Sequence, residues 1–267
     1  MDMRELPLVF FTLFTQTAVG LVLLAAVRSW VVAEGPDPRV RVEWSVVLGL
    51  LAVGVVAAFF HLGQPLGVFR MVSNLGAAWL SREILLFAAF GVVAAAAAAA
   101  AYRGSPRRWL VQVAAALGLL ALVATGMTYA APGMPALHNG IPLVSFGLTA
   151  VILGAAVGTY FAPEEMQRRL ASIVSHALVA ALLVYLVVPF VWLGGDAVMR
   201  ATGQAFLSSP LYWAHVVLGL GLPLGVVWRT QRIPAWLPVL LVLGELAGRV
   251  VFFGLVATSA GNIGLPY

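Results

Sequence analysis

Stretches of about twenty apolar residues recur along the whole chain, and they constrain its fold more than any other feature. A helix needs roughly twenty apolar residues to cross the hydrocarbon core of a bilayer. Only 9% of the 267 residues are charged, whereas about a quarter are charged in water-soluble domains. We therefore expect an all-α integral membrane protein in which residues 1–267 form a single transmembrane helical-bundle domain. The predicted helices are residues 7–32, 43–62, 82–102, 109–131, 141–162, 170–193, 211–228 and 234–258.

Arginine supplies all fifteen basic residues, and its distribution predicts the orientation of these eight helices. An even number of crossings puts both termini on one side, which carries four arginines in its loops and helix ends, against ten on the other side. Loops with the excess of basic residues face the cytoplasm, so we expect both termini on the outer (periplasmic) face. The same bias accounts for the net charge of +5, and no clustering calls for a nucleic-acid partner.

The predicted outer connections are longer than the tight arginine-bearing turns of the cytoplasmic side. The longest, residues 63–81, carries apolar residues at helical spacing with polar residues between them, which predicts an interfacial helix between the second and third transmembrane helices. A long loop of this kind is often functional, and a docking surface for another protein is the natural candidate. The apolar residues are Val68, Phe69, Val72, Leu75 and Trp79.

His61 and Glu83 flank this connection. His61 ends the second apolar run, just before the helix breakers Gly63 and Pro65. Either residue has a structural explanation, since an imidazole is tolerated at a helix end near the headgroups, and Ser81 can cap a helix whose dipole favours Glu83. Together they offer a hydrogen-bond partner and a base, which quinol oxidation requires. An apolar pocket with two polar groups would, however, also fit other lipophilic ligands.

Glu245 and Arg249 lie four residues apart near the middle of the last predicted helix. They share a face, and we expect them to pair with each other. A charge at mid-membrane costs about 2.5–3.5 kcal/mol on insertion scales, so the pair is expected to point into the bundle as a structural lock, with a ligand site or proton path as the alternative. Gly244 and Gly248 would let a neighbouring helix approach closely. Gln16 is expected to face inward from the first helix.

The absence of cysteine excludes disulfides, thiolate-held iron–sulfur clusters and covalently attached c-type haem in this protein. A transmembrane b-type haem needs two imidazoles at matching depth on facing helices. Only His61 and His215 could form such a pair, because His138 lies in an outer loop and His176 is alone near the cytoplasmic end of the sixth helix. We expect no haem and no metal, with a haem-bearing cytochrome b-type anchor as an alternative.

Three stretches resemble the membrane-anchor subunit of dimethyl sulfoxide reductase, a family within the polysulfide-reductase-type quinol-interacting subunits. They are "ELPLVFFTLFTQTAVG", "FFHLGQPLGVFRMVSNLGAAWLSREI" and "LGELAGRVVFFGL". The resemblance implies an eight-helix anchor in the bacterial or archaeal cytoplasmic (inner) membrane, without haem or metal. Such an anchor oxidises menaquinol near its outer face during anaerobic respiration and passes electrons to an iron–sulfur subunit, which feeds a molybdopterin catalytic subunit.

The resemblance also implies roles for individual residues. His61 within "HLGQP" corresponds to the quinol-site histidine of the family, and Glu83 within "SREI" corresponds to its functionally important glutamate, here the expected proton acceptor. We add Gln64, Arg70 and Gln16 to the predicted quinol-binding residues. The stretch "GGDAVMRATGQAFLSSP" departs from the family's pattern and leaves the partner and the terminal electron acceptor open.

A secondary transporter is the remaining alternative. Charged residues within the membrane, together with Pro189 and Pro223 within or near predicted helices, would be compatible with transport. The sequence does not, however, contain a matched pair of broken helices in its two halves, as many transporters do. We therefore favour the quinol-oxidising anchor.

Overall fold

The structure of the protein is a computed structural model, which describes residues 5–31, 38–61 and 74–259. Within these ranges eight helices are long and apolar enough to cross a membrane, which confirms the predicted number, and the regular elements are all helical. Seven spans are α1 (Leu6–Val31), α2 (Pro38–His61), α4 (Trp79–Tyr102), α5 (Arg108–Tyr129), α6 (Ile141–Gly158), α7 (Gln167–Leu193) and α11 (Leu237–Leu255). The other span combines α9 (Pro210–Ala214), the π-helix η5 (His215–Gly221) and α10 (Leu222–Thr230).

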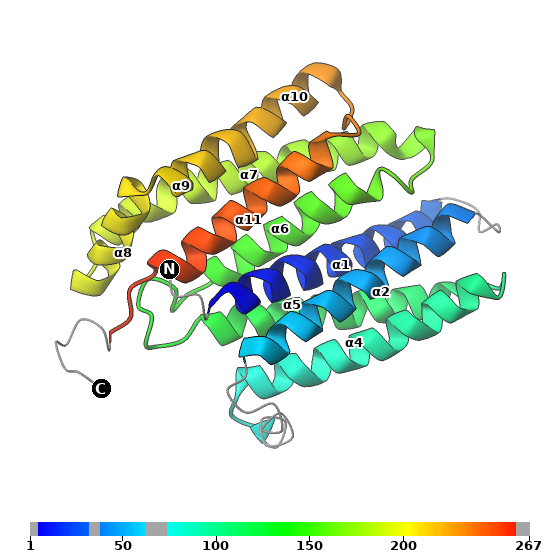
Figure 1. The fold of residues 1–267 in the computed structure, drawn as a ribbon, viewed down its shortest axis with the longest axis horizontal. Coiled ribbons are helices and arrows are strands. Elements are labelled where there is room, and N and C mark those ends of the chain that lie inside the picture. The colour runs from blue at the N-terminus through cyan, green and yellow to red at the C-terminus, as the bar shows by residue number, and fades with distance from the viewer. Residues whose placement is uncertain (1–4, 32–37, 62–73, 260–267) are drawn as a thin grey trace.

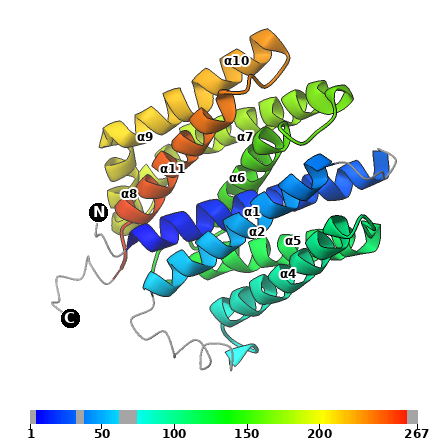
Figure 2. The same cartoon turned by 45° about the vertical axis from the view of Figure 1, so that its right-hand side comes forward.

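The spans form two groups of four helices, which lie side by side in Figures 1 and 2. In the first group α1, α2, α4 and α5 enclose one apolar core. In the second group α6, α7, α11 and the η5 span enclose another. α1 joins the groups, because it also packs against α6 and α11.

Two glycines bring α1 and α6 into backbone contact. A Cβ atom on Gly20 of α1 would lie 1.9 Å from the carbonyl oxygen of Ala150, and one on Gly154 of α6 would lie 2.3 Å from the carbonyl carbon of Gly20. Small residues at such crossings allow close van der Waals packing, which supplies much of the helix association in lipid. The two four-helix groups are therefore held together at a contact that tolerates no side chain.

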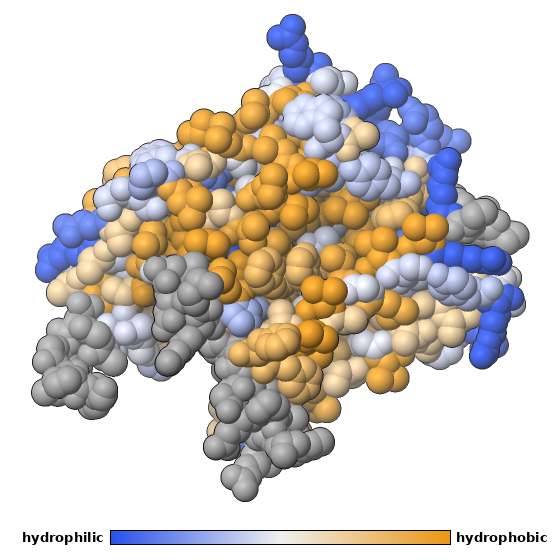
Figure 3. Space-filling model, in the orientation of Figure 1, coloured by the Kyte–Doolittle hydropathy of each residue, from blue (hydrophilic) through white to orange (hydrophobic). Residues whose placement is uncertain are grey.

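The two ends of the bundle differ in charge. α1 begins and α11 ends at the same end (Figure 1), which we call the terminal end. At the other end lie the connections 103–107, 159–166 and 231–236, and Figure 3 shows hydrophilic residues gathered at its right and upper right beyond a broad apolar band. We call this the arginine-rich end. The arrangement agrees with the unequal distribution of arginine in the sequence.

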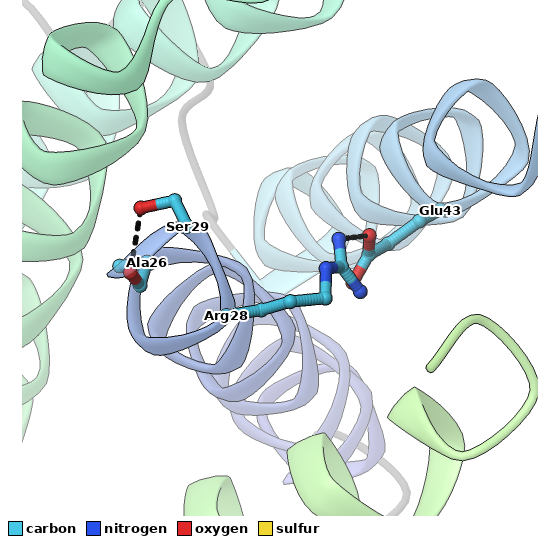
Figure 4. A network of polar contacts seen from close by, with 4 residues as sticks. All are labelled: Ala26, Arg28, Ser29 and Glu43. Carbon is cyan, nitrogen blue, oxygen red and sulfur yellow. Dashed lines mark hydrogen bonds and ion pairs between the residues drawn. The ribbon is translucent and has the colours of Figure 1, made fainter. Parts of the chain in front are cut away.

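A partly buried ion pair joins α1 to α2 towards the arginine-rich end (Figure 4). The Arg28 guanidinium donates to both carboxylate oxygens of Glu43, with Nη1 at 3.2 Å from Oε1 and Nη2 in close contact with Oε2. Beside it, the Ser29 hydroxyl donates to the Ala26 carbonyl at 2.8 Å. Gln112 of α5 donates to the same carbonyl at 3.1 Å and to Ser29 Oγ at 3.0 Å. Three helices of the first group are thus linked by polar contacts.

The stretch 194–210, which the sequence left unassigned, contains α8 (Ala197–Ser208). Asp196 caps this helix, because its Oδ1 accepts from the Met199 amide at 2.8 Å. The helix packs along the end of α7, where the rings of Phe206 and Trp192 lie 5.1 Å apart. Thr202 accepts from the Ala257 amide at 3.0 Å. α8 therefore ties the end of α7 to the segment that follows α11.

The π-helix in the seventh span precedes a proline. Pro223 has no N–H to donate to Gly219, and its ring would clash with that carbonyl in a regular α-helix. The wider turns of η5 end at Gly221, two residues before Pro223, so the irregular backbone lies where the proline removes an α-helical hydrogen bond.

Candidate functional site

Glu83 is enclosed by the first four-helix group near the terminal end. It is the fifth residue of α4 and only 3% exposed. The sequence suggested that Ser81 caps the helix and that Glu83 lies in its first turn, and this interpretation is wrong. The helix begins at Trp79 with Ala78 as its N-cap, and Ser81 is buried within it. Its side chain instead meets α5, where the Thr125 hydroxyl lies 3.0 Å from Oε1. Tertiary packing, rather than the helix dipole, accounts for its position.

The second carboxyl oxygen of Glu83 has no hydrogen-bond partner among the described residues and is buried. Phe87 lies one turn further along α4, and its ring meets that of Phe11 of α1 at 5.5 Å. The Thr128 hydroxyl of α5 is also near the carboxyl group. An ionised carboxylate in such surroundings is strongly disfavoured unless it is compensated. This oxygen is therefore suited to exchange a proton with a polar group that enters from outside the protein.

His61 is the last residue of α2, and α2 packs against α4. The helix of His61 therefore ends at the same end of the bundle as Glu83 (Figure 1). Several predicted features lie outside the described part of the chain: the His61 side chain, Gln64, Arg70 and the expected interfacial helix as far as residue 73. No residue from 55 to 60 is buried, so the last turns of α2 present apolar surface next to the beginning of α4.

Gln16 faces inward as expected, but its hydrogen bond connects it to a second polar cluster. Its Oε1 accepts from Arg249 Nη2 at 2.6 Å. The same Nη2 donates to the Thr149 hydroxyl at 2.5 Å, and Thr149 donates to Glu245 Oε2 at 2.6 Å. All four side chains are buried. We call Gln16, Thr149, Glu245 and Arg249 the intramembrane cluster; it links α1, α6 and α11.

The expected direct ion pair between Glu245 and Arg249 is not formed. Thr149 lies between the two charges and bonds to both, while the guanidinium carbon of Arg249 lies 4.3 Å from the centre of the Phe146 ring. Helical spacing brings residues four apart to one face, but it cannot exclude a third side chain from a neighbouring helix. The charges do point into the bundle, as their cost in lipid requires.

His215 lies beside this cluster. Its Nδ1 is 2.8 Å from the Gly244 carbonyl oxygen, and because a carbonyl can only accept, Nδ1 carries the proton. The ring centre is 4.5 Å from that of Tyr185, and a Cβ on Gly248 would lie 2.7 Å from its Cε1. Gly244 in turn touches the backbone of Gly219. This confirms the predicted close approach at Gly244 and Gly248.

The structure does not bring His61 and His215 onto facing helices. α2 belongs to the first group and η5 to the second, with α1 and α11 between them (Figures 1 and 2). His138 Nδ1 bonds with the Ala130 carbonyl at 2.8 Å, and His176 Nδ1 with the Ser172 carbonyl at 2.7 Å. In the described ranges no three His, Cys, Asp or Glu side chains gather to hold a metal ion.

Comparison with known proteins now connects the sequence to a family. The family described as "DMSO reductase anchor subunit (DmsC)" matches residues 1–255. The chain belongs to this family. The match confirms the resemblance carried by the three sequence stretches, and with the eight apolar helices it makes this DMSO reductase anchor subunit a multi-pass membrane protein.

Relatives of this anchor subunit align over nearly their whole length. The C subunit of the anaerobic dimethyl sulfoxide reductase of Haemophilus influenzae is 29% identical, with 97% of the present sequence and 98% of the relative covered. The anaerobic dimethyl sulfoxide reductase subunit YnfH of Escherichia coli is 28% identical, with 96% of both sequences covered. Both groups of helices, and with them Glu83 and the intramembrane cluster, therefore lie within the family's common length.

Proposed function

We propose that this protein is the quinol-oxidising subunit of a DMSO reductase-type molybdopterin complex in a bacterial or archaeal inner membrane. The observation that carries the proposal is the buried Glu83 carboxyl, which has one oxygen bonded to Thr125 and the other without a partner among the described residues. Its position near the end of the bundle would let a lipid-soluble reductant reach it while the proton leaves towards water. Membership of the anchor-subunit family supports the same function.

In the proposed reaction, menaquinol enters from the membrane and His61 hydrogen-bonds one of its hydroxyl groups. Glu83 accepts a proton from quinol and releases it outward. Conversion to quinone releases two protons and two electrons in all, and the electrons pass to the nearest cluster of an iron–sulfur subunit, which feeds a molybdopterin catalytic subunit. Gln64 and Arg70, in the connection after His61, are proposed to complete the quinol-binding site.

The proposed orientation has the arginine-rich end in the cytoplasm and the terminal end outside. The partner subunits would then dock on the terminal end. Two described connections at this end, residues 130–140 and 194–209, are longer than the turn at 103–107. They would offer a broader surface for a partner than the arginine-rich turns do.

The test compares His61→Ala with the unchanged protein in the purified complex. Two activities are measured: turnover driven by menaquinol, and turnover driven by a soluble dye that reduces the partner subunits directly. We expect His61→Ala to abolish only the quinol-driven activity while the complex assembles normally. Loss of assembly would make His61 structural, and retention of quinol-driven turnover would contradict the proposed site.

Purification of the tagged protein from its native membrane tests the proposed partners. Co-purification of an iron–sulfur subunit and a molybdopterin subunit, without a haem band in the visible spectrum, is the expected result. A haem band would favour the cytochrome b-type anchor. Recovery of the protein alone, together with substrate uptake into vesicles, would favour a transporter.

A further inference from the structure

An apolar groove of about 470 Å³ opens on the surface of the bundle between α4 and α5. Several of its residues are exposed, including Leu85 at 48% and Leu120 at 53%. Both helices are transmembrane spans, so this surface faces the hydrocarbon of the bilayer. The groove is lined by Leu75, Trp79, Arg82, Leu85, Leu86, Leu120, Val123 and Ala124.

Arg82 is the one charged residue in this lining, and its guanidinium is already engaged. Nε donates to the Leu75 carbonyl at 2.9 Å, Nη2 donates to the Gly76 carbonyl at 2.7 Å, and the group stacks on the Trp79 ring at 4.3 Å. These contacts lie where α4 begins, at the terminal end. The groove therefore has a polar rim at the membrane surface and apolar walls beyond it.

Glu83 lies directly behind this groove. On α4, the lining residues Trp79 and Leu86 are one turn before and one turn after Glu83, and on α5 Ala124 immediately precedes Thr125. The bond between Glu83 and Thr125 thus joins the same two helices at the same level. The groove and the Glu83–Thr125 contact therefore lie next to each other on the same pair of helices.

We propose that this groove is the lateral entrance for quinol and holds its isoprenoid tail while the head group lies at Glu83. The inference rests on the function proposed above and adds the route and the tail subsite. An apolar groove open to lipid suits a hydrocarbon tail. Beside it, the unpartnered oxygen of Glu83 is complementary to a neutral head group that can donate a hydroxyl hydrogen.

The test fills the groove with Leu120→Trp, at an exposed position of its lining. It compares two substrates in the intact complex: menaquinol with its long isoprenoid tail, and a tail-less menadiol. We expect kcat/KM for the long-tailed quinol to fall about tenfold, since an apolar subsite discriminates on this scale, and that for menadiol to change less than twofold. Val113→Trp is the matched control, because Val113 is an exposed residue of α5 that does not line the groove. It should leave both substrates unaffected.

The outcomes distinguish the proposed tail subsite from the proposed quinol-oxidising function. An equal effect on both substrates, or no effect on either, would overturn the groove as the tail subsite and leave lipid as its occupant. Failure of the unchanged complex to oxidise either quinol would instead overturn the proposed function. Dye-driven turnover reports the integrity of each variant complex. If Leu120→Trp does not assemble, Leu85→Trp at the exposed side of the same groove replaces it, with the same expectation.

Discussion

Thr125 and Glu83 meet 3.0 Å apart across the interface of α5 and α4. The Thr125 hydroxyl is also 3.0 Å from the Ala121 carbonyl oxygen, and it has one hydrogen to donate. An ionised Glu83 can receive that hydrogen, whereas a protonated Glu83 can donate to Thr125 while Thr125 donates to Ala121. The Thr125 hydroxyl can thus form a hydrogen bond with Glu83 in both of its protonation states. A group that takes up and releases a proton needs such a partner.

Thr125→Val tests this relationship. It leaves Glu83 Oε1 buried without its partner, at a cost of about 1–3 kcal/mol, so we expect menaquinol-driven turnover to fall roughly tenfold. Thr125→Ser keeps the hydroxyl and should retain most of the activity. Thr17→Val, which removes a buried hydroxyl that bonds to the Leu13 carbonyl within α1, is the control. Equal activity of the Val and Ser variants would show that Thr125 does not assist Glu83.

Glu83→Gln keeps the size of the side chain and removes the proton acceptor. General base catalysis contributes about 10²–10⁴-fold, so quinol-driven turnover should fall at least about 100-fold while the yield of assembled complex stays normal. Glu165→Gln changes an exposed acidic residue at the arginine-rich end and should have no effect. A Glu83→Gln complex with nearly full turnover would show that quinol gives its protons elsewhere.

Glu245→Gln should chiefly reduce the folded yield and thermal stability. Glu245 and Arg249 are opposite buried charges linked through Thr149. Removing one of two such charges costs about 3–5 kcal/mol, because the other stays buried without compensation. Adding Arg249→Gln should recover part of the loss, which a double-mutant cycle measures. Glu164→Gln breaks the exposed pair with Arg232 and should cost less than about 1 kcal/mol. Normal yield with lost turnover in Glu245→Gln would give the cluster a functional role instead.

Gly20→Ala should destabilise the contact between the two four-helix groups. Its Cβ would lie 1.9 Å from the Ala150 carbonyl oxygen, so α1 and α6 would have to separate, at a cost of about 1–3 kcal/mol or more. Gly147→Ala on α6 meets nothing within 4 Å and should be neutral or slightly stabilising. The melting temperature in detergent distinguishes them, and equal melting temperatures would contradict the close crossing.

The orientation can be measured by cysteine labelling, since the sequence has no cysteine of its own. Ser105→Cys lies in an exposed turn at the arginine-rich end, and Ser208→Cys at the exposed end of α8. A thiol reagent that cannot cross the membrane should label Ser208→Cys in intact cells whose outer membrane has been made permeable, and Ser105→Cys only after the inner membrane is opened. The reverse pattern would invert the proposed topology.

Apolar length predicted the eight helices, and therefore an even number of crossings, because it depends on local sequence alone. The close approach at Gly244 and Gly248 was also predictable from spacing alone. The contacts of Thr149 and Thr125 were not predicted, since each bonds to an acidic residue of another helix, 96 and 42 positions away. The only signal was a hydroxyl group in an apolar helix, which most often bonds to its own backbone.

His215 shows the same limit. Its position near the end of a helix was predictable, and this made it a possible partner for His61. Depth does not say which helices face each other, and the two helices belong to different groups. α8 was missed for another reason, because a helix of twelve residues is too short to register as a span and its burial depends on Trp192 of α7.

The bond between Gln16 and Arg249 also bears on how the protein is made. Among the described spans, Gln16 lies in the first and Arg249 in the last. During synthesis the amide of Gln16 therefore enters the membrane before its partner, 233 positions away, is made. Gly20 likewise enters the membrane before α6, against which it packs. The intramembrane cluster is therefore completed only when α11 inserts. A protein truncated before α11 would leave the Gln16 side chain without Arg249 and become a target for the quality-control proteases of the membrane.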